Sequence, residues 1–209
     1  MNIIESLKWR YATKKFDTNK KLSTAQLQLL KEAFNLTATS YGLQTISLVI
    51  VENKDLRAQL LPNCYNQQQV VDASHLLVIC YPDHFDGKDV AKYFKRVVDK
   101  RNTPEETIKP FRDFLIKDFD KKSIENKHNA FIKQAYIALG NLLTVCALEK
   151  IDSCPMEGFI PDRVDETLDL KSKNLKSALL LPVGFRADDD FMAKEKKVRK
   201  SLSEIIIEI

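Results

Sequence analysis

Glycine is scarce in this chain, and its scarcity excludes two common nucleotide-binding motifs. Only 5 glycines occur among 209 residues. Their spacing matches neither the GxGxxG turn of dinucleotide-binding domains nor the GxxxxGK[ST] phosphate-binding loop. A Rossmann-type domain and a P-loop enzyme are therefore excluded, and any nucleotide chemistry must use a site of another design.

Histidine and cysteine are also few, and they lack the spacing of metal ligands. The 3 histidines show no ligand spacing with one another or with a cysteine, so no zinc site is predicted. The 4 cysteines form no CxxC pair, and two of them lie in apolar runs. We interpret them as reduced thiols of a cytoplasmic protein. The chain also lacks the GxSxG motif of serine hydrolases.

Long hydrophobic runs and a strong charge of one sign are absent as well. The first residues, MNIIESLKWR, do not resemble a cleaved signal peptide. The longest apolar-rich segment, residues 135–148, is shorter than the roughly 20 residues that span a bilayer, so no membrane segment is expected. A net charge of +4 with alternating signs gives little support for a nucleic-acid partner.

The composition and local patterns predict one α+β domain over residues 1–209. A hydrophobic fraction of 44% with 30% charged residues is typical of a soluble globular chain. Strand patterns occur in TISLVIVE, HLLVICY, KSALLLPVGF and the terminal SEIIIEI. Helical patterns outnumber them and do not alternate regularly with them, which favours α+β over a doubly wound sheet.

Several helices carry recognisable start signals or an informative distribution of apolar residues. Ser23 and Gln26 form a capping box before an amphipathic helix. Thr103 is a predicted cap with Pro104 in the first turn, and Pro110 is expected to kink or break that helix. Residues 129–149 are apolar nearly all round, which predicts a central, buried helix.

Segments spread over nearly the whole chain together resemble the FMN-dependent nitroreductase family, of the oxygen-insensitive NAD(P)H nitroreductase type. They are RYATKKFD, TATSYGLQT, NQQQVVDASH, QAYIALGNLL, PMEGF and KKVRK, in family order. The resemblance implies a nitroreductase-like fold with a central, mainly antiparallel sheet surrounded by helices. It also implies an intertwined homodimer that exchanges its C-terminal strand and binds FMN at the subunit interface.

By this resemblance, two basic clusters from opposite ends of the chain hold the FMN phosphate. Arg10, Lys197 and Arg199 would contact it, and Tyr11 and Ala12 would line the turn through their backbone. A phosphate dianion held largely away from water requires such fixed cations. Each basic run taken alone is more typical of a solvated surface, and the matched order of segments is what favours a binding site.

The resemblance places three further residues at the pyrimidine edge of the flavin. Lys14 would stabilise the anionic hydroquinone. Gln69 stands where many relatives carry a second lysine, so a lower flavin potential is expected. Asn66 can both donate and accept hydrogen bonds at this edge, although its position also suits a helix cap.

Two loops complete the implied flavin site. Ser40 and Gln44 would hydrogen-bond ribityl or ring groups, and Gly42 would permit close backbone approach in place of the polar residue that is common there. Glu157 and Gly158 would direct backbone N–H groups toward flavin N5. Without the resemblance, these segments are a loop between a helix and a strand and a turn after an edge strand.

The predicted function is FMN-dependent oxidation of NADH or NADPH coupled to reduction of nitroaromatics, quinones or similar acceptors in ping-pong two-electron steps. No side chain is predicted to be catalytic, because the flavin carries the reactive atom. Phe111, Phe114 or Phe119 could form a shelf for the acceptor or belong to the core. The alternatives are a flavin reductase dedicated to one metabolite, a pteridine or an enone, and a non-catalytic flavin-binding or interaction protein.

Overall fold

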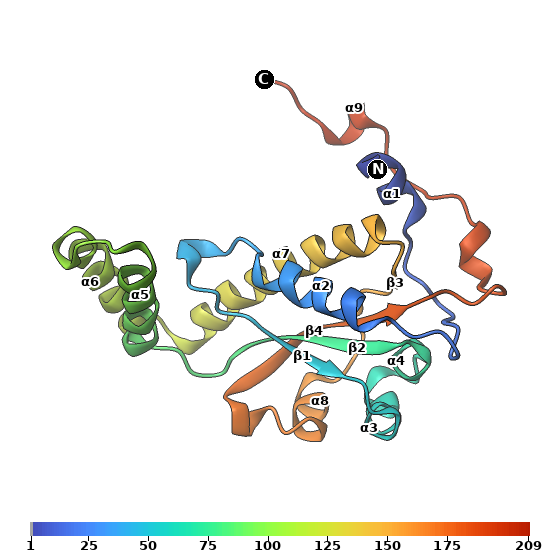
Figure 1. Ribbon diagram of the computed structural model, residues 1–209, viewed down its shortest axis with the longest axis horizontal. Helices are drawn as coiled ribbons and strands as arrows, with labels where there is room; N and C mark the ends of the chain where they lie inside the picture. Colours follow the sequence, from blue (N-terminus) through green and yellow to red (C-terminus); the bar gives the residue numbers. More distant parts are fainter. Residues whose placement is uncertain (1) are drawn as a thin grey trace.

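The computed structural model describes residues 2–209 as an antiparallel sheet with helices on both faces (Figure 1). The strand order is β1-β2-β4-β3, and each neighbouring pair is antiparallel. The strands are β1 (Ser47–Val51), β2 (His75–Pro82), β3 (Asp152–Ser153) and β4 (Leu175–Gly184). The predicted α+β fold is confirmed, and β1, β2 and β4 lie where the sequence predicted strands.

The central strand β2 is buried on both faces because its side chains alternate between two hydrophobic layers. Leu76 and Val78 face one layer, whereas Leu77 and Ile79 face the other. Figure 1 shows the helices on either side of the sheet. On one side lie α2 (Thr24–Asn35) and α7 (Ile124–Leu148), and on the other α3 (Lys54–Leu60), α4 (Gln69–Asp72) and α8 (Pro161–Thr167).

Helices α5 (Gly87–Arg101) and α6 (Glu105–Lys121) form a hairpin that projects to one end of the molecule (Figure 1). Helix α6 differs from the prediction at its start, because Pro104 is the N-cap and no side chain caps the helix. Pro110 lies inside α6 and does not break it. The buried contacts of Leu115 and Phe119 hold the helix together despite the missing backbone donor.

The N-terminal helix α1 (Ile3–Trp9) was not predicted from the sequence. It is only 7 residues long, and the Asn2 side chain caps it by accepting from the backbone N–H groups of Ile4 and Glu5. Helix α1 packs against α7. A short helix of this kind depends on such packing, because its own propensity is weak.

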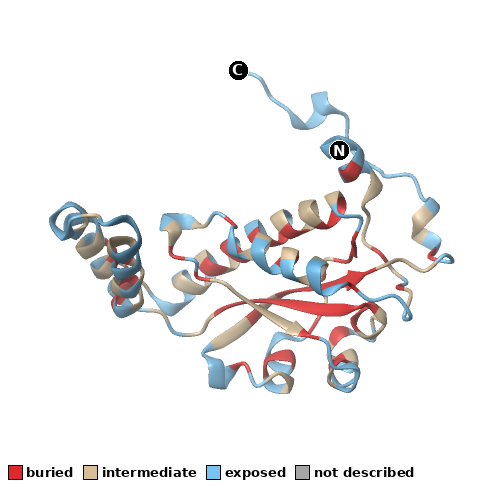
Figure 2. Cartoon of the chain, viewed as in Figure 1, coloured by how far each residue is buried: buried red, intermediate tan, exposed pale blue. Residues whose placement is uncertain are grey.

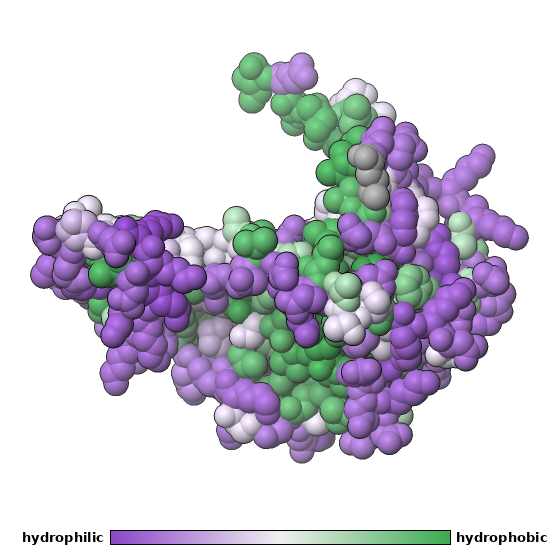
Figure 3. Space-filling model, in the orientation of Figure 1, coloured by the Kyte–Doolittle hydropathy of each residue, from purple (hydrophilic) through white to green (hydrophobic). Residues whose placement is uncertain are grey.

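The predicted strand over residues 203–209 is not present in the single chain. Leu202–Ile205 form a short helix, α9, whose capping box pairs Ser201 with Glu204. The isoleucines that follow are exposed, and Figures 2 and 3 show this tail as a hydrophobic segment that projects from the body. Within residues 2–209 the tail pairs with no strand of the sheet, so strand exchange with a second copy stays a prediction.

Helix α7 is the central helix, as predicted, but it is not buried all round. Phe131, Ala135 and Leu142 are buried, whereas Tyr136 and Ile137 remain 43% and 49% exposed. By length and composition alone, α7 could also cross a membrane. The core helix of a soluble protein meets the same criteria, and α7 packs directly on β2 and β4. The exposed side of α7 therefore leaves the apolar surface of Tyr136 and Ile137 open to solvent in the single chain.

Candidate functional site

The stretch RYATKKF follows the edge of the sheet. Ala12 forms a parallel bridge with Ser153, and the backbone N–H of Thr13 donates to the Ser153 carbonyl at 3.2 Å. Phe16 forms an antiparallel bridge with Arg186, which comes just after β4. Edge pairing thus carries the N-terminal basic cluster to the same side of the molecule as the chain that leaves β4.

A buried carboxylate fixes the shape of this stretch. Asp190 is 3% exposed, and its carboxylate accepts from the Tyr11 hydroxyl at 2.9 Å and from the backbone N–H groups of Lys14 and Lys15 at 2.9 and 3.2 Å. Burial alone would raise the pKa of Asp190, but the hydrogen bonds from the Met192, Lys14 and Lys15 amides hold it below its ordinary value. Asp190 therefore orients the backbone from which Lys14 projects.

The two basic clusters predicted to share an anion lie together. The Lys197 ammonium contacts the backbone carbonyl of Arg10, which lies near the opposite end of the sequence. Partial burial lowers the pKa of Lys197, and the positive charges of Arg10 and Arg199 lower it further. Three cations at one place repel one another, and an anion bound among them would relieve that repulsion. The sequence identified Arg10, Lys197 and Arg199 as candidates, and the fold places these three residues together.

Two other predicted residues, Lys14 and Gln69, act on the buried thiol of Cys154. Burial raises the pKa of Cys154, while the Lys14 charge and a hydrogen bond from Gln69 oppose that rise. Gln69 begins α4 and is 7% exposed. Lys14 and Gln69 therefore both act on the Cys154 thiol from different elements, and their contact with a flavin stays a prediction.

The segments that carry Asn66 and Gly158 are tied to each other. The Gln67 side-chain amide donates to the Gly158 carbonyl at 2.8 Å, and a methyl group added at Gly158 would stand 3.1 Å from that amide nitrogen. Asn66 is exposed with φ of 55° and caps no helix, since the N-cap of α4 is Gln68. The Glu157 carboxylate accepts a hydrogen bond from Tyr136 of α7, which raises the pKa of that tyrosine.

The remaining predicted residues lie elsewhere in the chain. Ser40, Gly42 and Gln44 belong to the loop that joins α2 to β1 and contains the short helix η1 (Ser40–Gly42). Figure 1 shows this light-blue loop beside the middle of the molecule and the α5–α6 hairpin, well apart from the segments near both chain ends. One chain therefore holds two separated parts of the predicted site.

Sequence reasoning missed three residues that shape these parts. Gln134 of α7 is 8% exposed, and its side-chain oxygen accepts from the Ser40 backbone N–H at 2.9 Å. Cys154 directly precedes PMEGF, so its place next to that motif was the available signal. Asp190 and Gln134 gave no signal, because each acts through backbone contacts with a segment more than 90 residues away.

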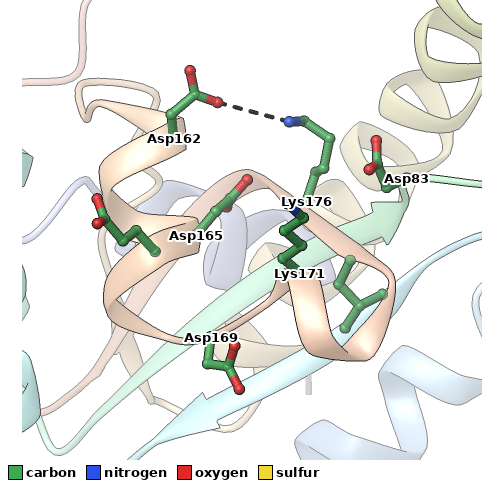
Figure 4. Close-up of a pocket in the computed structure, with 8 residues that line it drawn as sticks. Asp83, Asp162, Asp165, Asp169, Lys171 and Lys176 are labelled. Carbon is green, nitrogen blue, oxygen red and sulfur yellow. Dashed lines mark ion pairs between the residues drawn. The ribbon is translucent and has the colours of Figure 1, made fainter.

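A separate pocket of about 460 Å³ lies between α8 and the start of β4 (Figure 4). Its labelled lining residues are acidic or basic, and Lys176 pairs with Asp162 at 3.7 Å. The described residues include no group of three or more histidine, cysteine, aspartate or glutamate side chains arranged to hold a metal ion. None of the predicted site residues lines this pocket.

Comparison with known proteins identifies the family of this chain. The model of the nitroreductase family matches residues 7–185. The chain belongs to the nitroreductase family. A Staphylococcus epidermidis protein with the provisional name NAD(P)H nitroreductase is 33% identical over 215 residues, which cover 98% of this chain and 95% of that protein. The oxygen-insensitive NAD(P)H nitroreductase of Salmonella typhimurium is 28% identical over 223 residues, which cover all of both chains.

A solved structure shares the fold. The crystal structure of a provisionally named nitroreductase from Exiguobacterium sibiricum, in complex with FMN, matches with a TM-score of 0.84 and 19% identity. The match covers 100% of this chain and 98% of that one. The predicted nitroreductase-like fold is confirmed, and the prediction of an oxidoreductase with FMN and NAD(P)H is confirmed at the level of the family. The role of each nitroreductase site residue stays a prediction.

Proposed function

We propose that this chain is an FMN-dependent NAD(P)H oxidoreductase that reduces nitroaromatics, quinones or similar acceptors by alternating two-electron transfers. The observation that carries this proposal is that Arg10, Lys197 and Arg199 lie together although they come from opposite ends of the sequence. Lys14 and Gln69 form a second group, because both act on the Cys154 thiol. FMN has the matching order of groups, with a phosphate dianion at one end and a hydrogen-bonding pyrimidine edge at the other.

Each part of the proposed site has a physical task. Arg10, Lys197 and Arg199 hold the phosphate by charge-assisted hydrogen bonds. Lys14 supplies a fixed positive charge, oriented by Asp190, where negative charge accumulates upon reduction. Bound FMN would supply the hydride chemistry, and the Glu157–Gly158 backbone would border its reactive edge. No side chain of this chain has to act as an acid or a base in hydride transfer.

We further propose that the active form is a homodimer with shared sites. The loop 40–44 lies apart from the cationic cluster of its own chain, so a second copy can provide it. The uncovered side of α7, formed by Tyr136 and Ile137, and the exposed isoleucines of the C-terminal tail offer apolar surface for that contact. In this arrangement the tail pairs with the partner's sheet, which is the predicted strand exchange.

The acceptor would bind between the flavin and an aromatic surface. Phe111 and Phe114 are 47% and 60% exposed and stack at 6.5 Å, whereas Phe119 is buried in the hydrophobic cluster of the hairpin. Of the three phenylalanines predicted as a shelf or as core, Phe119 therefore belongs to the core. Phe111 and Phe114 can receive a planar acceptor by stacking.

A cytoplasmic location is part of the proposal. All 4 cysteines are free and buried. Burial raises the pKa of Cys64 to about 11 and that of Cys80 and Cys146 to about 12, so these three thiols stay protonated and unreactive at neutral pH. Free thiols of this kind are compatible with a reducing compartment.

Purification followed by reduction without oxygen tests the proposed function. We expect a yellow protein whose flavin absorbance is bleached by NADH or NADPH and restored by a quinone or a nitroaromatic compound. A colourless protein that does not bind added FMN would contradict the proposal. Bound flavin that neither nicotinamide reduces would favour a non-catalytic flavin protein, and reoxidation by a single pteridine or enone would favour a dedicated reductase.

A further inference from the structure

The loop at residues 40–44 has an unusual backbone. Tyr41 has φ of 58°, Gly42 of +71° and Gln44 of 49°. Positive φ is uncommon for residues other than glycine, and it persists only where the surroundings hold it. Two such residues flanking a glycine in one short loop therefore call for contacts that fix the loop from outside.

Two polar contacts fix the loop on the side of the protein body. The Ser40 backbone N–H donates to the Gln134 side chain of α7 at 2.9 Å. The Gln44 side-chain amide donates to the Asn35 carbonyl, at the end of α2, at 2.9 Å. These bonds hold the two ends of the loop. Between them the Gly42 backbone N–H donates to the Thr39 carbonyl at 3.0 Å, which closes a turn within the loop itself.

The α5–α6 hairpin supplies the contacts at the centre of the loop. The Tyr93 hydroxyl of α5 packs against Gly42 so closely that a methyl group added at Gly42 would stand 2.4 Å from the hydroxyl oxygen and 3.1 Å from the ring carbon that bears it. The Tyr41 ring meets the edge of Phe111 of α6, with centroids 6.1 Å apart. Phe94 then joins Tyr93 and Phe111 into one aromatic cluster.

We propose that Tyr93 is a positioning residue that sets the distance between the α5–α6 hairpin and the loop 40–44. Its phenol occupies the space that any side chain at position 42 would need, so the sizes of residues 42 and 93 are coupled. The inference rests on the proposed function, in which this loop borders the flavin bound by the partner copy. Through Gly42, Tyr93 then controls both retention of FMN and the room left for an acceptor.

The α5–α6 hairpin indicates which class of acceptor this contact would affect. Phe111 and Phe114 of α6 are exposed, and Phe111 belongs to the same aromatic cluster as Tyr93. Moving the loop away from α5 changes the gap between Tyr41 and these rings. Extended planar acceptors, such as two-ring quinones, are most sensitive to the width of that gap. A one-ring quinone is smaller and requires less space between the rings.

A double-mutant cycle on FMN affinity tests the coupling. The variants are Gly42→Ala, Tyr93→Phe and their combination, with fluorescence titration of FMN as the measurement. Alanine at φ of +71° is strained in either background, and the cycle cancels that cost. We expect Gly42→Ala to raise the FMN dissociation constant about tenfold in the parent protein and about threefold or less with Tyr93→Phe. An equal rise in both backgrounds overturns the inference.

Acceptor selectivity provides the readout that a purely structural role would not change. We expect Gly42→Ala, assayed with saturating FMN, to raise KM for 2-methyl-1,4-naphthoquinone about threefold more than KM for 1,4-benzoquinone. Equal changes for both quinones contradict control of the acceptor by this contact.

Should Gly42→Ala fold in neither background, Tyr93→Leu releases the loop from the other side, and an unchanged FMN dissociation constant then overturns the inference. Parent protein that binds no FMN instead refutes the proposed function.

Discussion

At the scale of single residues, the proposed FMN site depends on fixed positive charges that contact the phosphate. Arg10→Ala removes a charge-assisted contact that can be bidentate, worth about 1.5 to 3 kcal/mol, so we expect FMN to bind roughly tenfold to a hundredfold more weakly. Equilibrium dialysis of FMN gives the dissociation constant. Lys20→Ala is the matched control, because Lys20 lies in the same segment but pairs with Asp17 on the surface. Equal affinity in Arg10→Ala and the parent would remove Arg10 from the site.

The flavin potential reports on a second residue. Gln69→Lys adds a cation near Lys14, and a cation there stabilises the reduced, anionic flavin, so we expect the two-electron potential to rise. Spectroelectrochemical titration measures the shift, and Gln68→Lys serves as control because Gln68 is exposed. A potential that stays constant or falls would show that Gln69 does not face the pyrimidine edge.

The residues that the sequence revealed are those whose side chains act in a recognisable motif. Arg10, Lys14 and Gln69 stand within such motifs. Asp190 could not be found in this way, because it is more than 170 residues away from Tyr11, Lys14 and Lys15 in the sequence. Two of these three partners are backbone N–H groups, and a backbone donor leaves no mark in a sequence.

At the scale of elements, the C-terminal tail is the segment whose behaviour differs most from its pattern. A chain that ends after Arg199 keeps every proposed phosphate contact and loses only α9 and the exposed isoleucines. We expect this truncated protein to form a weaker dimer and to release FMN upon dilution. Sedimentation measured together with flavin absorbance provides the test.

A matched control separates the tail isoleucines from helix α9. Glu204→Ala removes the capping box with Ser201 but keeps the apolar tail, so we expect its dimer to match that of the parent. A truncated protein that remains a stable yellow dimer would show that the tail does not reach the partner.

Elements were predictable from the sequence where local pattern and packing agree. Strand β2 is an apolar run buried between two helical layers, so its pattern and its place in the fold coincide. Helix α1 is short and depends on α7, and the tail is rich in isoleucine like a strand but pairs with no strand among the described residues. In both cases the deciding contact lies outside the segment, where its local pattern does not show it.

At the scale of the whole molecule, the uncovered side of α7 leads us to expect that two copies of the chain associate. Ile137→Glu places a charge on that apolar side, and desolvating the charge at an interface is costly. We therefore expect the variant to be mostly monomeric and its FMN dissociation constant to rise about tenfold or more, the effect of a lost interface contact. Light scattering with flavin absorbance measures both. Ile124→Glu is the control, since Ile124 is similarly exposed but lies at the first residue of α7, whereas Ile137 lies in its middle. Dissociation in neither variant would remove this side of α7 from the interface.

The shared site can be tested most directly by mixing two defective proteins. Arg10→Ala disables the cationic part, and Ser40→Trp fills the loop part, so neither homodimer should retain FMN. Unfolding and refolding the two together at equal amounts gives half mixed dimers, each with one intact and one doubly defective site if the parts come from different chains. We expect flavin reduction by NAD(P)H to return to about a quarter of the parent's sites, as follows from two-fold symmetry. Mixed protein that is as inactive as its components would show that each site lies within one chain.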